Sequence, residues 1–152
     1  MFVTTEPAQN LLEQTRASAH PHCVVCGRAA DCGLDLSFRL RRDGGVEAEF
    51  ECVRRYQGYE GLLHGGVTSS LLDGAMTNCL FAHGIAAVTA EMTVRFRHPI
   101  AVSQSLVVRA RIMRSERPLH VVDAEIIQDD QVKAKASGKF MERADGKQQA
   151  AP

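Results

Sequence analysis

A nearly uncharged run of residues constrains the fold more than any other part of this chain. From Val67 to Ala82 the only charged side chain is Asp73. The apolar residues recur at helical spacing and cover most of the helix surface; they are Val67, Leu71, Leu72, Ala75, Met76, Cys79 and Leu80. The run therefore predicts a helix that other structure encloses, with one partly desolvated carboxylate on it.

The turn before this helix predicts a place where a polarised oxygen can bind. His64-Gly65-Gly66 opens the helix, and neither glycine has a side chain to cover its N–H group. The first N–H groups of a helix have no intrahelical acceptor and lie at the positive end of the helix dipole. A carbonyl oxygen bound there would be polarised, and a developing negative charge would be stabilised. Together with Asp73, this pattern suggests acyl-group chemistry.

Six alternating apolar and polar runs predict strands that each have one wet face. They cover residues 34–41, 46–52, 88–97, 106–112, 122–126 and 132–140. Asp43-Gly44-Gly45 and Asp129-Asp130 predict turns between strands, and Gly84 predicts the end of the central helix. The expected fold is α+β, with a curved antiparallel sheet of about six strands wrapped around one central helix.

The chain is expected to form one main domain. Residues 20–142 carry the predicted sheet and helix, and the polar residues 143–152 predict a flexible tail. Residues 1–19 form an N-terminal arm with one short predicted helix over 8–17. The sequence does not decide whether this arm packs on the domain or frays.

Charge and hydropathy exclude several classes of partner. Lysine and arginine together number 18, as do aspartate and glutamate, so the sequence predicts no nucleic-acid partner. No apolar run reaches the roughly 18 residues that a membrane-spanning helix needs, so no membrane partner is expected. Five cysteines without a basic and then apolar leader fit a reducing compartment, and the expected location is cytoplasmic.

The cysteines near the N-terminus have the spacing of half a zinc site. Cys23 and Cys26 form a Cys-x-x-Cys-Gly pair, with histidines at positions 20 and 22 and Cys32 further along. No second pair follows, and a lone pair is a weak signal. We therefore expect no metal and no cofactor here, and interpret the segment as a packed loop with buried thiols.

Two segments resemble those of hotdog-fold acyl-CoA thioesterases, nearest to the phenylacetic-acid-type or PaaI-like group. The first is Tyr56-Gln-Gly-Tyr-Glu-Gly-Leu-Leu-His64-Gly65-Gly66-Val67, continuing to Leu71-Leu72-Asp73. The second is Thr89-Ala-Glu91-Met92-Thr-Val94-Arg-Phe96-Arg-His98-Pro99, and the likeness covers roughly residues 20–141. The resemblance implies the fold described above and an acyl-CoA substrate. It also implies a homodimer with each active site at the dimer interface, and leaves open whether two dimers associate further.

The resemblance also implies roles for individual residues. Asp73 lies nine positions after the motif histidine and corresponds to the general base or nucleophile. Gly65 corresponds to the residue whose N–H polarises the thioester carbonyl, and Thr89 to a hydroxyl that helps hold the water. Thr77 is a further catalytic candidate because it faces Asp73 one helical turn on. The expected substrate-binding residues are Gln57, Gly58, His64, Gly66, Arg95, Arg97 and His98.

The chain departs from the family pattern at three positions. Many relatives have asparagine or glutamine six residues before the motif histidine, where this chain has Gly58 beside Gln57. A shifted loop would be needed for Gln57 to serve. Gly74 replaces a frequent acidic residue, and strict alternation puts Thr89 on the polar face, so its access to the site requires a bulge or a strand-start position.

Two functions from different classes follow. The first is an acyl-CoA thioesterase that acts on a small aromatic or a short- or medium-chain acyl group. The alternative is a non-catalytic acyl-CoA or small-ligand binding module that keeps the fold, which Gly58 favours because it supplies no amide side chain. A hotdog dehydratase is a third option, although such enzymes usually have an Asp/His pair in a different setting.

Overall fold

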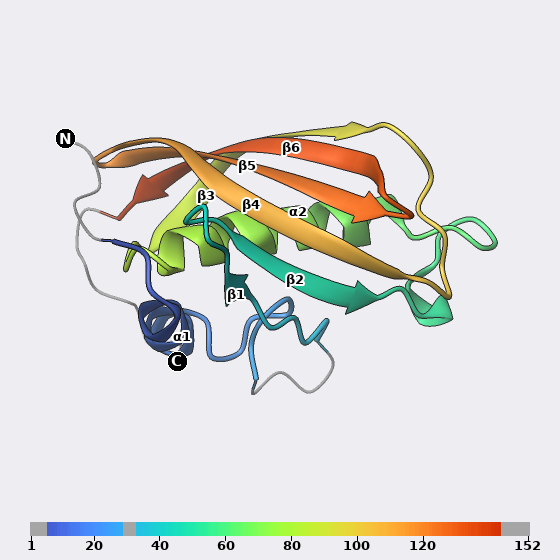
Figure 1. The fold of residues 1–152 in the computed structure, drawn as a ribbon, viewed down its shortest axis with the longest axis horizontal. Helices are drawn as coiled ribbons and strands as arrows, with labels where there is room; N and C mark the ends of the chain where they lie inside the picture. Colours follow the sequence, from blue (N-terminus) through green and yellow to red (C-terminus); the bar gives the residue numbers. More distant parts are fainter. Residues whose placement is uncertain (1–5, 29–32, 144–152) are drawn as a thin grey trace.

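The computed structural model describes residues 6–28 and 33–143. The elements in chain order are α1 (Gln9–Ala19), β1 (Arg39–Leu40), β2 (Val46–Glu51), a 3₁₀ turn (Arg54–Tyr56), α2 (Gly65–Phe81), β3 (Ala87–Phe96), β4 (Ser105–Glu116), β5 (Leu119–Gln128) and β6 (Gln131–Glu142). The sheet curves around α2, which confirms the expected α+β fold (Figure 1). Of the predicted tail, only Arg143 lies within the described residues.

The sheet is antiparallel throughout and has the strand order β1-β2-β4-β5-β6-β3. The β5–β6 hairpin turns at Asp129 and Asp130, which both have positive φ angles of 53° and 56°. Aspartate tolerates this left-handed conformation better than most residues. Because β3 adds to the far side of β6, the two edges of the sheet are β1 and β3, and the ten-residue β3 has a free edge as far as residues 6–28 and 33–143 are concerned.

Helix α2 forms the centre of the core. Its side chains at positions 71, 72, 75, 76, 79 and 80 have no exposed surface, as the uncharged run predicts. They pack against the inner face of the sheet, where Val108, Val122 and Phe140 are also fully buried. Burial of one large apolar side chain contributes about 1.5–3 kcal/mol, so this interface dominates the stability of the fold. Gly84, at φ 72°, follows the end of the helix as expected.

The N-terminal helix packs on the C-terminal half of α2. The Ala8 N–H donates to the carbonyl of Ala82 at 3.0 Å, and Leu12 is 1% exposed. In Figure 1, α1 lies beside α2 on the side away from the sheet. The question that the sequence left open is therefore answered for residues 6–19, which pack against the domain. None of the helices in the described residues is long and apolar enough to cross a membrane.

The first predicted strand is much shorter than its alternating pattern. Residues 34–38 lie outside the sheet: Asp35 has a positive φ angle of 50°, and the N–H groups of Leu34 and Leu36 donate to the carbonyls of Val24 and Val25 at 2.7 and 2.9 Å. Leu36 is nevertheless buried, as the alternation requires. The pattern correctly predicted which side chains are buried but not which backbone groups they pair with.

Candidate active site

Histidine 64 caps the start of α2. Its Nδ1 atom accepts a hydrogen bond of 2.8 Å from the Gly66 N–H, and its backbone is extended at φ −64° and ψ 135°. The side chain thereby satisfies one of the four N–H groups that a helix start leaves without an acceptor. The expectation that both glycines offer free N–H groups is wrong for Gly66, whose N–H already has a partner.

The N–H of Gly65 is left for a ligand. Gly65 is the exposed first residue of α2, and no acceptor for its N–H lies among residues 6–28 and 33–143. A Cβ atom placed on Gly65 would lie 3.6 Å from the ring of Phe96, which is itself 58% exposed. The helix start therefore combines a polar donor with an apolar wall. This is the pairing that a carbonyl attached to an apolar group needs.

Asp73 is held by a hydroxyl from the neighbouring strand. Its side chain is half-buried on α2, and Thr89 of β3 donates a hydrogen bond to its Oδ1 at 2.7 Å. The bond fixes one carboxylate oxygen and leaves Oδ2 able to accept another hydrogen bond. The structure thus brings together two of the residues that the sequence assigned to one site.

A β-bulge makes this contact possible. Thr89 pairs with Phe140 and Glu91 pairs with Lys139, so Ala90 is an extra residue in β3. Directly paired residues of an antiparallel sheet share a face. Since Phe140 is fully buried, Thr89 lies on the face toward α2. This is the bulge that access of Thr89 to the site requires.

The same bulge corrects the prediction for the start of β3. Strict alternation puts Val88 on the core face with Met92, but Val88 is 52% exposed and pairs with Met141 on the opposite face. One inserted residue reverses the phase of every side chain before it. The apolar pattern of this strand therefore changes faces part-way along.

Two further positions on α2 differ in their surroundings. Thr77 is buried one turn after Asp73, and no hydrogen bond joins the two in the described part of the chain. Gly74 faces the loop before β1, and a Cβ atom there would lie 2.4 Å from Cγ1 of Val25. The close packing of Val25 leaves no room for a side chain at Gly74, which explains the absence of an acidic residue.

The family model of the thioesterase superfamily matches residues 60–135, which is half of the 152-residue chain. The matched segment contains Gly65, Asp73 and Thr89. The chain belongs to the thioesterase superfamily. Membership assigns it to a family of thioester hydrolases. No curated protein sequence matches the chain.

Solved structures of this superfamily share the fold. The thioesterase superfamily protein RHA08564 superposes with a TM-score of 0.74 at 26% identity, over 79% of this chain and 63% of that protein's length. PaaI of E. coli, from the phenylacetic acid degradation operon, gives 0.74 at 23% identity over 89% and 95% of the two chains. The smu.793 protein of Streptococcus mutans, bound to acetyl-CoA, gives 0.69 at 22% identity over 76% and 94%.

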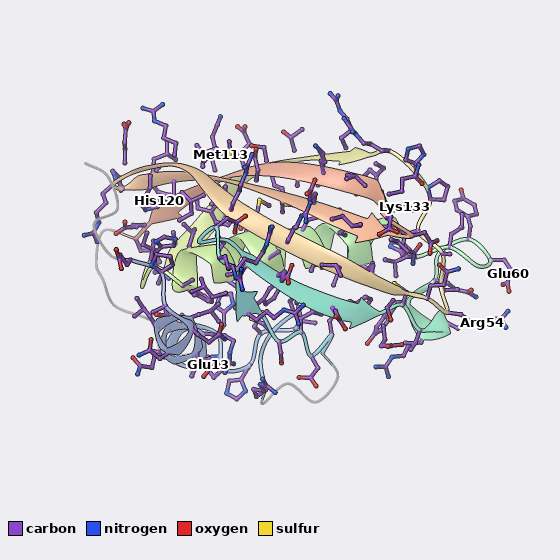
Figure 2. The ribbon with its side chains drawn as sticks, viewed as in Figure 1. Glu13, Arg54, Glu60, Met113, His120 and Lys133 are labelled. Atoms are coloured by element: carbon purple, nitrogen blue, oxygen red, sulfur yellow. The ribbon has the colours of Figure 1, made fainter. Side chains whose placement is uncertain are left out.

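The loop before α2 lacks the amide that thioesterases often place near the site. Gln57 accepts a hydrogen bond from the Gly61 N–H at 3.2 Å and donates to Glu60 at 3.3 Å. Its amide therefore stays within the loop, and the shifted loop that would let Gln57 serve is not present. A Cβ atom on Gly58 would lie 3.2 Å from the His64 ring, so this position packs tightly against the helix cap. Glu60 and Arg54 project from this end of the molecule (Figure 2).

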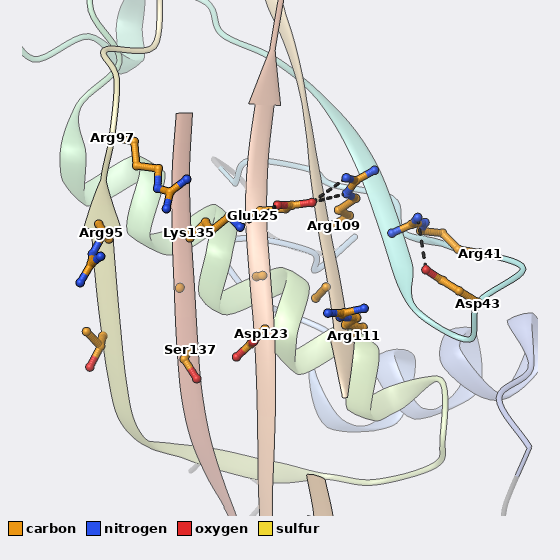
Figure 3. Close-up of a pocket in the computed structure, with 14 residues that line it drawn as sticks. Arg41, Asp43, Arg95, Arg97, Arg109, Arg111, Asp123, Glu125, Lys135 and Ser137 are labelled. Atoms are coloured by element: carbon orange, nitrogen blue, oxygen red, sulfur yellow. Dashed lines mark hydrogen bonds and ion pairs between the residues drawn. The ribbon is translucent and has the colours of Figure 1, made fainter. Parts of the chain in front are cut away.

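Two expected substrate-binding residues, Arg95 and Arg97, lie on another face of the protomer. Arg95 pairs with Lys135 on the outer face of the sheet, since it alternates with Val94, which packs against the core. Arg95 and Arg97 line a cavity of about 480 Å³ together with cations from β4 and acidic residues from β5 (Figure 3). Neither Asp73 nor Gly65 lines this cavity. Within one chain Arg95 and Arg97 therefore lie at this cavity and not at the Asp73 site, and His98 is exposed just after β3.

A group of potential metal ligands lies outside the Asp73 site. His20, Cys23 and Cys26 converge in the loop after α1, with their donor atoms all within 4.8 Å of one another. The pKa of the Cys23 thiol is lowered chiefly by hydrogen bonding with Cys26, and also by His20 and two backbone N–H groups. The Cys26 thiol has a raised pKa because of Cys23 and its own burial.

Sequence reasoning also missed a buried polar chain at the opposite end of the molecule from Glu60 (Figure 2). Ser115 Oγ lies 2.6 Å from His120 Nδ1, and His120 Nε2 lies 2.8 Å from Glu142 Oε1. His120 is fully buried, and Glu142 also pairs with Arg117 at 2.6 Å. The three residues come from β4, β5 and β6, and only the strand register brings them together.

Proposed function

We propose that this chain hydrolyses acyl-CoA thioesters, with Asp73 as the general base or nucleophile. The hydrogen bond from Thr89 to Asp73 carries the proposal, because it fixes the orientation of the carboxylate beside the free edge of the sheet. Membership of the thioesterase superfamily supplies the reaction class. A carboxylate held in place with one oxygen available is suited to accept a proton from water.

The proposed reaction has two polar contributions from the protein. The thioester carbonyl oxygen accepts a hydrogen bond from the Gly65 N–H, which stabilises the charge that develops on this oxygen. Asp73 takes a proton from a water molecule whose oxygen attacks the carbonyl carbon. The tetrahedral intermediate then collapses, the carbon–sulfur bond breaks, and the leaving thiolate takes up the proton. In the variant with a nucleophilic carboxylate, Asp73 attacks the carbonyl carbon, the carbon–sulfur bond breaks to release the thiolate, and water then cleaves the resulting anhydride to regenerate the carboxylate.

The Gly65 N–H and the Asp73 carboxylate of one site are best supplied by two different chains. Gly65 and Asp73 are eight positions apart on one helix, which is a rise of about 12 Å and an offset of about 80° around the axis. A nucleophile must come within about 3–3.5 Å of the carbonyl carbon. A thioester held at Gly65 is therefore beyond direct attack by Asp73 of the same chain. We propose that each site combines Asp73 of one protomer with the Gly65 N–H of the partner subunit.

The proposed acyl group is small and aromatic, or short to medium in length. The half-buried Met92 and the exposed ring of Phe96 line the α2 side of β3 near these polar groups and offer an apolar surface. The Streptococcus mutans structure holds acetyl-CoA, and PaaI comes from a phenylacetic acid degradation operon. Both observations support an acyl-CoA substrate within this size range.

A panel of acyl-CoA esters, with release of the free thiol as the readout, tests the proposal. Replacing Asp73 with asparagine keeps the size of the side chain but removes the base. We expect Asp73→Asn to lower kcat by at least about a hundredfold with little change in KM, since general-base catalysis contributes about 10²–10⁴-fold. The matched control is Asp123→Asn on the outer face of β5, which should retain wild-type turnover. A folded Asp73→Asn protein with kcat within a few-fold of wild type refutes the assignment.

The second candidate is a binding module without turnover. The engagement of Gln57 within its own loop and the absence of a side chain at Gly58 favour it, because no amide is available to hold water or the thioester. Calorimetric titration distinguishes the two candidates. Binding of acyl-CoA by wild-type protein without thiol release from any ester of the panel supports the binding module and contradicts hydrolysis.

A further inference from the structure

One nitrogen and two sulfur donors of the N-terminal segment have the spacing of a metal site. His20 ends α1, and Cys23 and Cys26 follow in the next turn. The His20 Nδ1 atom lies 3.9 Å from the Cys26 sulfur, and the three donor atoms lie within 4.8 Å of one another. Tetrahedral zinc, with bonds of about 2.3 Å to sulfur and about 2.0–2.1 Å to nitrogen, separates such atoms by about 3.6–3.8 Å. Small side-chain adjustments therefore bring all three donors onto one ion.

The turn itself is shaped to present sulfur. The Val25 N–H donates to the Cys23 sulfur at 3.4 Å, and the Gly27 N–H donates to the Cys23 carbonyl at 2.8 Å. A Cβ atom on Gly27 would lie only 2.3 Å from the Cys23 nitrogen, so this tight turn requires glycine. N–H groups directed at a sulfur favour its thiolate form, and the thiolate is the form that binds metal.

The surroundings connect this turn to the central helix. The His20 ring packs edge-on against Phe81 of α2 at 4.9 Å, and Asn78 of α2 interacts with the Cys26 side chain. Asn78 Oδ1 is buried and has no hydrogen-bond partner among the described residues. Arg16 donates to the Cys26 carbonyl at 3.2 Å and adds positive charge near the Cys26 side chain. An ion at this position would fix the loop after α1 in the place where it packs against the C-terminal half of α2.

We propose that His20, Cys23 and Cys26 bind one Zn²⁺ ion, with water as the fourth ligand. Binding displaces the thiol protons to solvent, and the two thiolates neutralise the charge of the ion. The sequence analysis expected no metal, because the cysteine pair is only half of a ligand set. The structure adds His20 as a third donor, and the proposal departs from that expectation. It does not depend on the proposed hydrolysis.

Zinc titration of the reduced, chelator-stripped protein tests the proposal. Competition with a chromophoric zinc indicator should give about one ion per chain. Cys23 is only half-buried, so Cys23→Ser is the variant least able to disturb folding. We expect it to weaken binding by more than about a hundredfold, because loss of a ligand's supporting hydrogen bond alone costs about 10–100-fold. The matched control, Cys52→Ser, replaces a buried cysteine outside the group and should bind zinc as wild type does.

A histidine pair and a spectroscopic probe complete the test. His20→Gln should weaken binding, whereas His22→Gln, an exposed neighbour outside the group, should not. Cobalt(II) should give a thiolate-to-metal charge-transfer band in wild type and in Cys52→Ser, but not in Cys23→Ser. Zinc should raise the melting temperature of wild type and leave that of Cys23→Ser unchanged. Wild-type protein without stoichiometric zinc, or Cys23→Ser protein with wild-type affinity, overturns the proposal.

Discussion

At the scale of single residues, the orientation of Asp73 depends on one hydroxyl group. Thr89 reaches the carboxylate only because Ala90 is an extra residue in the strand. Thr89→Val keeps the branched shape but removes the donor. A hydrogen bond to a charged group contributes about 1.5–3 kcal/mol, so kcat should fall by about 10–100-fold while KM changes little.

The matched controls for this prediction lie at the same position and on the same strand. Thr89→Ser restores the hydroxyl and should recover most of the turnover. Thr93→Val makes the same change on the outer face, where Thr93 pairs with Ser137, and should leave kcat unchanged. Equal turnover of Thr89→Val and wild type contradicts the positioning role.

The Ser115–His120–Glu142 chain predicts a pH dependence of stability. Arg117, helped by His120, holds the pKa of Glu142 below its ordinary value. An ionised Glu142 therefore stabilises the fold fully above the unfolded-state pKa of about 4.3, and this contribution is lost as pH falls through the lowered pKa. Thermal unfolding should show that Glu142→Gln lowers the melting temperature at pH 7 but much less at pH 3. Glu49→Gln, at an exposed site, should do neither; a Glu142→Gln deficit of equal size at both pH values contradicts the prediction.

At the scale of elements, the sequence predicted α2 best because the signal is local and strong. A run whose only charged residue is Asp73 allows few alternatives to an enclosed helix, although the hydrogen bond from the Gly66 N–H to the His64 side chain was not predicted. The strands were predicted for the same reason, since alternation reports which side chains are buried. β1 was overestimated because alternation does not say which backbone groups form hydrogen bonds, and residues 34–38 pair with a loop.

The site was harder to predict than the elements that form it. The residues Val88 to Met92 alternate without a break, so no side chain marks the inserted residue that turns Thr89 toward Asp73. From the sequence we could say only that Thr89 would need a bulge, or a position at the start of the strand, to reach Asp73. The Ser115–His120–Glu142 chain depends on the register of three strands, which local pattern does not determine.

At the scale of the whole molecule, the free edge of β3 predicts a homodimer. Val88 and Phe96 are more than half exposed on this ten-residue edge strand, and an unpaired edge is a surface for a second copy. Light scattering should give twice the chain mass of 16.6 kDa, or four times if dimers pair. A stable monomer that retains full hydrolytic activity is incompatible with a site shared between chains.

Two substitutions at Gly65 separate the loss of its N–H group from the addition of a side chain. Gly65→Pro removes the N–H at the first helical position, where proline is well tolerated, and the extended His64 before it suits a proline. Gly65→Ala keeps the donor and brings its Cβ only into ordinary contact with Phe96. Loss of one oxyanion donor typically costs about 10²–10³ in kcat, which is expected for Gly65→Pro and not for Gly65→Ala.

Mixing two inactive variants tests the central claim most directly. Asp73→Asn and Gly65→Pro chains carry different tags, are combined by co-expression, and the doubly tagged hybrid is purified. If Asp73 and Gly65 act on one thioester across the interface, one site of the hybrid has both intact groups, and kcat per hybrid dimer should be about half that of wild type. The two parent proteins should stay at least about a hundredfold below wild type. A hybrid no more active than its parents would contradict the shared site.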